Sequence, residues 1–353
     1  MINQIINHEL YIQRCLQIAQ NGIGNARPNP SVGAVIVFDN KIIGEGFTSA
    51  YGENHAEVNA INSVKNKTLL KEATIYVTLE PCAHFGKTPP CADLLVKHQF
   101  KMVVIGCLDS NDLVAGKGVG RLRKAGINVI VGVLEDECRL HHKRFFTVQE
   151  KKRPYVILKW AETIDGFIAP LTKNMQKPVW ISNKISQQLV HKYRSEEHAI
   201  LVGTNTVIAD NPKLNVRSWF GNNPVRIVLD RNLRIPKNRN VFDGSIKTIV
   251  ITETKEHFHF QEDKAIFFEI INFSKNIAKQ ICEVLQKHQI QSVIIEGGTQ
   301  TLQTFIDANL WDEARVFTGD TSFIKGIKAP VFCAKITSEI KIKNDILKRY
   351  SND

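Results

Sequence analysis

Residues of the types that form a catalytic zinc site occur in two short stretches of the sequence. His55 and Glu57 make a His-x-Glu pair, and Cys82 and Cys91 each follow a proline. A catalytic zinc keeps three protein ligands and leaves its fourth position to water, whose pKa falls to about 7. We expect His55, Cys82 and Cys91 to be the ligands. Glu57 would carry protons from that water to a ring nitrogen and departing ammonia, so the sequence predicts one Zn2+ per chain and hydrolytic deamination of a heterocycle.

The interval between the two cysteines is longer than in the usual deaminase signature. That signature has Pro-Cys-x-x-Cys, whereas eight residues separate Cys82 from Cys91 here. The alternative is a structural zinc site, which usually has four protein ligands in short paired spacings. His84 is the one nearby candidate for a fourth ligand. The His-x-Glu pair at a predicted strand and helix favours catalysis.

Alternating strands and helices are predicted to position these residues. His55 and Cys91 each begin a predicted helix, and the positive N-terminal end of a helix lowers the pKa of a nearby thiol. Apolar periodicity predicts helices over 10–20, 55–64, 91–98, 116–125 and 135–146, and strands over 32–38, 42–47, 74–78, 102–107 and 128–131. This alternation indicates an α/β sandwich.

A second α/β pattern begins after a charged segment that ends at Pro154. With 353 residues the chain is long enough for two domains. We expect a zinc-dependent deaminase domain over 1–147, a linker over 148–153 and a second domain over 154–353. The second domain's buried strands are predicted over 155–160, 199–202, 225–229, 248–252 and 292–295.

Composition and charge narrow the classes of function. The chain has 43% hydrophobic and 23% charged residues, as globular proteins do. Its apolar runs fall short of the roughly 18 residues of a membrane span, and its first 20 residues lack signal-peptide features. We therefore expect a cytoplasmic protein with no membrane partner. The formal charge of +11 favours anionic partners, either phosphorylated small molecules or nucleic acid, but the basic residues are dispersed and the densest cluster, 151–153, lies in the predicted linker.

Two glycine-containing stretches could bind phosphate. Glu296-Gly297-Gly298 follows a predicted strand and opens a predicted helix over 299–309, so its amides could hold the pyrophosphate of NADPH. A Gly-Gly turn alone is more often a tight connection. Gly116-x-Gly118-x-Gly120 lacks the spacing of a dinucleotide fingerprint and lies in the deaminase domain.

Taken together, these motifs resemble the bifunctional deaminase-reductase family of riboflavin biosynthesis over nearly the whole chain. The resemblance rests on Pro28-Asn29-Pro30-Ser31-Val32-Gly33, His55-Ala56-Glu57, the run 81–91, Leu158-Lys159-Trp160-Ala161, Asp165-Gly166, Trp180-Ile181-Ser182, 203–207, 210–212 and 296–305. It implies an N-terminal cytidine-deaminase-like α/β/α sandwich and a dihydrofolate-reductase-like α/β domain. It also implies a phosphorylated pyrimidine substrate, NADPH as cofactor, no nucleic-acid partner and a homo-oligomer.

The resemblance assigns further site residues position by position. The deaminase substrate would contact Asn29, His84, Lys87, Asp109 and Asn111. NADPH would contact Ala161, Ile168, Trp180, Thr206, Asp210 and Gly298. The reductase substrate would contact Lys159, Asp165, Arg194, Leu214, Arg217 and Glu296. Lys159 and Asp165 are candidates for positioning or proton transfer, and either arginine could instead form a surface ion pair.

The sequence departs from the family pattern at three positions. Thr48 stands where the family usually has histidine, and Ser110 and Asp112 stand where it has prolines. The zinc ligands and Glu57 are intact, so these departures concern substrate contacts more than the chemistry.

Two other functions are compatible with parts of the sequence. One is a zinc deaminase of nucleosides or tRNA with a non-catalytic C-terminal binding domain, which the charge of +11 favours. The other is a zinc-stabilised binding module without turnover. Absence of NADPH binding would favour the first, and unfolding on metal removal would favour the second.

Overall fold

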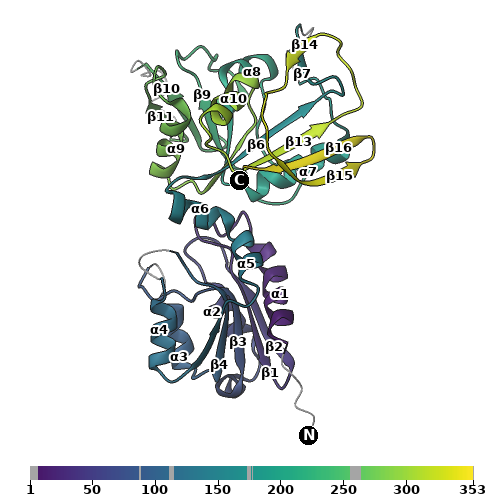
Figure 1. Cartoon of the computed structure of the whole chain (residues 1–353). Helices are drawn as coiled ribbons and strands as arrows, with labels where there is room; N and C mark the ends of the chain where they lie inside the picture. Colours follow the sequence, from purple (N-terminus) through teal and green to yellow (C-terminus); the bar gives the residue numbers. More distant parts are fainter. Residues whose placement is uncertain are drawn as a thin grey trace. The chain divides into compact units, whose positions relative to one another are not determined.

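The chain divides into two compact units in the computed structural model, which describes residues 7–86, 89–110, 115–172, 176, 178–254 and 264–352. The units are Met1–Lys152 and Arg153–Asp353, and each contains its own sheet (Figure 1). Both are mixed α/β structures, as the sequence predicts.

The first unit is a five-stranded sheet with helices on both faces. Its strand order is β2-β1-β3-β4-β5, antiparallel between β2, β1 and β3 and parallel from β3 to β5. The elements are α1 (His8–Ala19), η1 (Gln20–Gly22), β1 (Gly33–Phe38), β2 (Lys41–Phe47), α2 (Ala56–Ser63), η2 (Lys67–Glu72), β3 (Thr74–Leu79), α3 (Cys91–Lys97), β4 (Met102–Cys107), α4 (Lys117–Lys124), β5 (Asn128–Val131), α5 (Glu135–His141) and α6 (Lys143–Lys151).

Alternating side chains of β1 bury both faces of this sheet. Val35 and Val37 pack in a cluster with Ile12 of α1, whereas Ala34 and Ile36 pack in a second cluster with residues of α2, α3 and α4. A strand presents successive side chains to opposite faces, so a nearly continuous apolar run is buried twice. The predicted α/β/α sandwich is confirmed.

The junction between the units differs from the predicted linker. The expected helix over 135–146 is two helices, and the second, α6, continues to Lys151, so much of the segment 148–153 is helical. Phe145 and Phe146 anchor α6 in the apolar cluster on the α1 face. The helix ends where Lys152 adopts a left-handed φ of 52°.

The second unit is built on a nine-stranded sheet. Its order is β11-β10-β9-β8-β12-β6-β13-β16-β15, parallel from β11 to β13 and antiparallel in the last three strands. The elements are β6 (Tyr155–Glu162), β7 (Phe167–Pro170), α7 (Lys184–Glu196), β8 (Ala199–Gly203), α8 (Thr204–Asp210), β9 (Val225–Leu229), η3 (Asn240–Phe242), β10 (Thr248–Thr252), β11 (Ile266–Ile270), α9 (Ile277–Lys287), β12 (Ser292–Ile295), α10 (Thr299–Asp307), β13 (Glu313–Thr318), β14 (Gly326–Lys328), β15 (Lys335–Ile342) and β16 (Asp345–Ser351).

The five strands expected in this unit are present, and six others were not expected. Those six are β7, β11, β13, β14, β15 and β16. Most side chains of β15 are exposed, and β13 begins with a buried ion pair between Glu313 and Arg315 at 2.6 Å. In β13 and β15 these polar residues interrupt the apolar pattern on which strand prediction depends.

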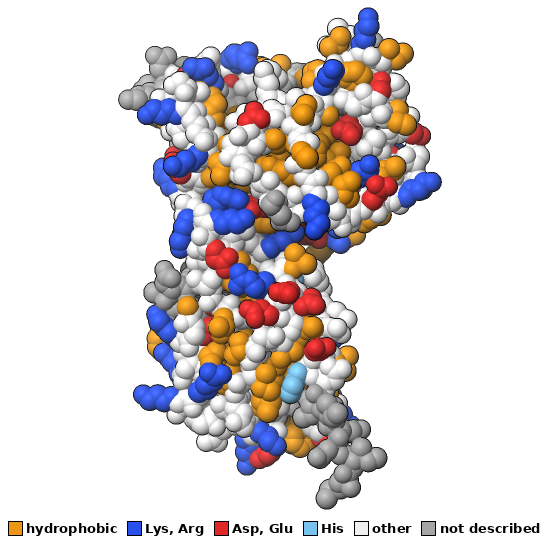
Figure 2. Space-filling model, in the orientation of Figure 1, with side chains coloured by type: hydrophobic (Ala, Val, Ile, Leu, Met, Phe, Trp, Pro, Cys, Tyr) orange, Lys and Arg blue, Asp and Glu red, His pale blue; other side chains and the backbone are white. Residues whose placement is uncertain are grey.

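None of the helices within the described ranges is long and apolar enough to cross a bilayer. On the face drawn in Figure 2, Lys and Arg side chains are dispersed and lie among acidic ones.

Candidate active sites

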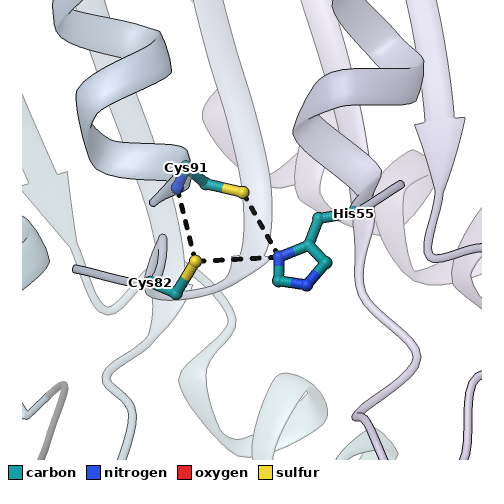
Figure 3. A group of neighbouring side chains, drawn as sticks. All are labelled: His55, Cys82 and Cys91. Atoms are coloured by element: carbon teal, nitrogen blue, oxygen red, sulfur yellow. Dashed lines mark hydrogen bonds between the residues drawn. The ribbon is translucent and has the colours of Figure 1, made fainter. Parts of the chain in front are cut away.

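The three predicted zinc ligands converge in the first unit. Their potential ligand atoms all lie within 4.8 Å of one another, and they form the single candidate metal group found among the described residues. Both sulfur atoms point at the same ring nitrogen (Figure 3): Cys91 Sγ lies 3.3 Å and Cys82 Sγ 3.7 Å from His55 Nδ1. One imidazole and two thiols around a common centre are a donor set that suits zinc.

Two helix N-termini and a loop hold the ligands. His55 is the N-cap residue of α2, and Cys91 is the first residue of α3. The Cys91 amide donates a hydrogen bond to Cys82 Sγ at 3.3 Å, and the Ala92 amide donates to the Cys82 carbonyl at 3.1 Å. The partial positive charge of a helix N-terminus favours a thiolate. A hydrogen bond with Cys91 and a weaker contribution from a hydrogen bond with His55 lower the pKa of Cys82 to about 4 despite its burial.

Glu57 lies beside this cluster in the first turn of α2. Its side chain is buried, and burial raises the pKa of its carboxyl group, with the negative charge of Cys82 adding to the effect. A carboxyl group whose pKa is raised toward neutrality can both accept and return a proton. Its position is the one that the His-x-Glu spacing predicts.

The predicted deaminase substrate contacts fall into two groups. Asn29 and Asp109 are half-buried, and His84 is exposed and is no member of the metal group. Lys87 and Asn111 lie outside the described residues, as does Asp112.

Thr48, one of the departures from the family pattern, has a structural task. It is buried, and its Oγ1 accepts a hydrogen bond from the Val32 amide at 3.0 Å. The Thr48 amide donates to the Val32 carbonyl at 3.0 Å. These bonds tie the end of β2 to the start of β1. Ser110 is half-buried, and its hydroxyl has no hydrogen-bond partner among the residues described.

In the second unit, three predicted substrate contacts form a largely buried charge cluster. Arg194 Nη2 donates to Glu296 Oε2 at 2.6 Å, and Lys159 Nζ lies 3.7 Å from Glu296 Oε1. Burial alone would raise the pKa of Glu296, but the positive charges of Arg194 and Lys159 outweigh it and lower that pKa to about 2. Burial lowers the pKa of Lys159. The cluster therefore holds a carboxylate between two cations.

Two polar atoms of this cluster have unused hydrogen-bonding capacity. Arg194 Nε and Glu296 Oε1 are buried and have no hydrogen-bond partner within the described part of the chain. Buried polar atoms are nearly always paired, so such atoms at a strand end indicate a ligand site. Sheet order brings the cluster together, because Lys159 follows Leu158 in β6, which pairs with Ile295 of β12.

Two other predicted substrate contacts, Leu214 and Arg217, lie in a segment that α7 holds. The Arg217 amide donates to His191 Nδ1 at 3.4 Å, and Arg194 Nη1 lies 3.5 Å from the Asn215 carbonyl, so α7 holds the segment that follows the buried Leu214. The guanidinium of Arg217 contacts Asn215. His191 is buried, and burial together with Arg194 lowers its pKa to about 4, so the ring is neutral and can accept this bond.

Asp165 is committed to a turn. Its carboxylate accepts hydrogen bonds from Thr163 Oγ1 at 2.5 Å, Ser322 Oγ at 2.6 Å and the Ile324 amide at 2.8 Å. These bonds hold the pKa of Asp165 far below its usual range. Such a group is suited to fixing a loop.

Two adjacent helix N-termini mark the predicted cofactor site. Strands β8 and β12 are parallel neighbours, and each leads directly into a helix, α8 and α10. Gly298 is the N-cap of α10, and a methyl group added there would meet only Thr206 Oγ1, at 3.9 Å. Amides at a helix N-terminus bind phosphate, and the bare glycine leaves room for it to approach.

The remaining predicted NADPH contacts are spread around this edge. Ala161 lies in β6, Ile168 in β7, and Asp210 ends α8. Trp180 is exposed, and the contacts described for the chain do not join it to Gly298. The structure thus brings Thr206 and Gly298 together, and Asp210 lies one helical turn after Thr206 in α8.

Sequence reasoning missed two residues that organise these sites. Glu80 follows β3 directly, next to Pro81-Cys82, and accepts hydrogen bonds from three main-chain amides, and His191 holds the 215–217 segment. The acidic residue before Pro-Cys was a usable signal for Glu80. No comparable local signal marks His191.

Family models and relatives match both units. The RibD C-terminal domain model matches residues 154–350, and the cytidine and deoxycytidylate deaminase zinc-binding region model matches residues 5–107. The riboflavin biosynthesis protein RibD of Aquifex aeolicus is 42% identical over 309 residues, which are 87% of this chain and 85% of that protein. RibD of Escherichia coli is 34% identical over 341 residues, 88% of this chain and 86% of that protein.

Solved structures match nearly the whole chain. RibD of Acinetobacter baumannii in its form 1 has a TM-score of 0.88 at 33% identity, covering 98% of each chain. A Thermotoga maritima protein has a TM-score of 0.87 at 37% identity, also covering 98% of each chain. That protein is described as a diaminohydroxyphosphoribosylaminopyrimidine deaminase/5-amino-6-(5-phosphoribosylamino)uracil reductase.

Proposed function

The chain belongs to the RibD family of riboflavin biosynthesis, whose members combine a zinc-dependent deaminase with an NADPH-dependent reductase, and we propose the following substrate and residue roles for it. The substrate is 2,5-diamino-6-(5-phosphoribosylamino)pyrimidin-4-one. The first unit removes its 2-amino group, and the second reduces the ribosyl side chain of the product to ribityl. The observation that carries the proposal is the convergence of His55, Cys82 and Cys91 beside buried Glu57.

For the deamination, we assign ligand roles to His55, Cys82 and Cys91 and proton transfer to Glu57. Zinc, when bound, supplies a water molecule that ionises near neutral pH. Glu57 accepts the proton of the attacking water and donates protons to the ring nitrogen and to the departing ammonia. Its raised pKa suits both directions of transfer. Asn29, His84, Lys87, Asp109 and Asn111 would contact the substrate.

For the reduction, bound NADPH would supply a hydride to the sugar carbon of the open imine, and the imine nitrogen would take up a proton. We propose that Lys159 provides the accompanying proton, because its buried ammonium has a lowered pKa and lies beside Glu296. Asp165, the other candidate, is supported only in a structural role, since its carboxylate already accepts hydrogen bonds from Ser322 Oγ and the Ile324 amide. Arg194 holds Glu296 through an ion pair. Arg217 and Leu214 are the remaining proposed contacts with the reductase substrate.

The NADPH phosphates are proposed to bind at Gly298 and Thr206, where α10 and α8 begin. Ala161, Ile168, Trp180 and Asp210 are further proposed contacts. The match of the reductase family model to residues 154–350 argues against a merely binding C-terminal domain. A homo-oligomeric state and a cytoplasmic location stay predictions.

The test supplies the phosphorylated diaminopyrimidinone with and without NADPH and follows ammonia release and nicotinamide absorbance separately. We expect ammonia release in both cases, and NADPH consumption only after deamination. Ammonia release that required NADPH, or NADPH consumption without prior deamination, would contradict the assigned substrate and order of steps.

A further inference from the structure

One buried carboxylate in the first unit is used by neither proposed reaction. Glu80, at the end of β3, has only 4% of its surface exposed. Its Oε2 accepts hydrogen bonds from the Asp109 amide at 3.3 Å and the Gly116 amide at 3.0 Å, and its Oε1 accepts one from the Val119 amide at 3.0 Å. All three donors belong to the segment between β4 and the first turn of α4.

The glycines of the Gly116-x-Gly118 motif make this arrangement possible. Gly116 has a left-handed φ of 74° at the N-cap of α4, which favours glycine. A methyl group at Gly118 would lie 2.2 Å from the Pro81 carbonyl oxygen and 3.1 Å from Glu80 Oε1. The start of α4 is therefore packed directly against the main chain that leads into Cys82. The glycines of this motif therefore allow α4 to pack closely against the chain at Pro81, next to Cys82.

We propose that Glu80 is a positioning residue of the deaminase site. It joins the chain that leads into Cys82 to the main-chain amides of Asp109 and Gly116, and so fixes Asp109 relative to Cys82. Three main-chain amides, two of them at the start of α4, donate hydrogen bonds to the Glu80 side chain, so the link is restrained at several points. The inference rests on the proposed contact between Asp109 and the deaminase substrate.

The two chemistries of the chain make the test specific. Glu80→Gln keeps one oxygen but places amide donors against a main-chain amide, so part of the link is lost. We expect the deaminase KM to rise about tenfold or more, with a smaller change in kcat, full zinc content and an unchanged reductase rate. Glu72→Gln, at an exposed position of η2, is the matched control and should leave both reactions unchanged.

A second variant reaches the same link without touching the carboxylate. Gly118→Ala must push the start of α4 away from Pro81, and we expect it also to raise the deaminase KM. A wild-type KM in Glu80→Gln, or equal losses of zinc and kcat at unchanged KM, would overturn the positioning role.

Asp109→Asn, measured in parallel, separates the proposed substrate contact of Asp109 from the positioning role of Glu80. If it raises the KM and Glu80→Gln does not, only the positioning role fails. If Asp109→Asn leaves the KM at the wild-type value, the proposed substrate contact fails, and the inference that depends on it fails too.

Discussion

The main-chain amide of Cys91 donates a hydrogen bond to the sulfur of Cys82 across 3.3 Å. The two proposed ligands are thus joined directly, although eight residues separate them in the sequence. A main-chain donor to a ligand sulfur fixes its orientation and favours its thiolate form, as groups around metal ligands commonly do. The long interval therefore does not loosen the site.

Removal of zinc by a chelator should abolish ammonia release and leave the reduction of separately supplied aminouracil substrate unchanged. The ligands lie in the first unit, whose apolar clusters pack on both faces of its own sheet. Far-ultraviolet circular dichroism should therefore change little. Unfolding of the first unit on chelation would instead assign the zinc a structural role.

Glu57→Gln should lower the deamination rate by roughly 10²- to 10⁴-fold, the usual contribution of a positioned acid-base group. Zinc content and the reductase rate should match the wild type. Glu53→Gln, at an exposed position two residues before His55, is the control. Deamination at the normal rate in Glu57→Gln would refute the proton-transfer role.

Lys159→Met should lower the reductase kcat by roughly 100-fold or more and spare deamination. Lys159→Arg distinguishes the possible reasons, because arginine keeps the charge beside Glu296 but releases no proton near neutral pH. If Lys159 transfers a proton, Arg will not restore the rate. Substantial recovery with Arg would leave only an electrostatic role, and Lys275→Met, at an exposed site, controls for charge loss.

Gly298→Ala should raise the KM for NADPH by about tenfold, or about 1.4 kcal/mol, without lowering the midpoint of thermal unfolding. The added methyl group meets only Thr206 Oγ1, at 3.9 Å, so the fold accommodates it. Gly297→Ala is the contrast, since its methyl group would lie 2.6 Å from Thr301 Cβ and should destabilise the domain. Unchanged NADPH kinetics in Gly298→Ala would place the pyrophosphate elsewhere.

The second unit should lose stability as the pH falls from about 6.5 to 4 because of His191. Its pKa is lowered from 6.5 to about 4, so over this range the unfolded chain binds a proton that the folded chain does not. The loss is at most about 3 kcal/mol. Urea unfolding of the wild type and His191→Gln at pH 7 and pH 5 should show the difference between them shrinking at pH 5. An unchanged difference would contradict a neutral buried His191.

Local patterns were sufficient to predict the clustered His55, Cys82 and Cys91 and all five strands of the first sheet. His55, Glu57 and Cys91 sit at helix starts, where short-range spacing is informative. The meeting of Lys159, Arg194 and Glu296 depends on β12 lying between β8 and β6, which no local pattern encodes. Their assignment to one substrate site came only from the resemblance to a known family.

Sequence patterns also fail to identify polar residues whose partners are main-chain groups far along the chain. Glu80 binds amides that lie 29 to 39 residues further along the chain, so its role depends on a parallel pairing between β3 and β4. The strand β15 was missed for a related reason, because its mostly exposed side chains lack an apolar face.

Each of the five buried clusters formed by the described residues lies wholly within one unit. Inherited damage to one core should accordingly remove one reaction and spare the other. A cell with such an allele would accumulate a single intermediate and could be complemented by a separate gene for the missing step. The arrangement makes the two activities genetically divisible although one chain carries both.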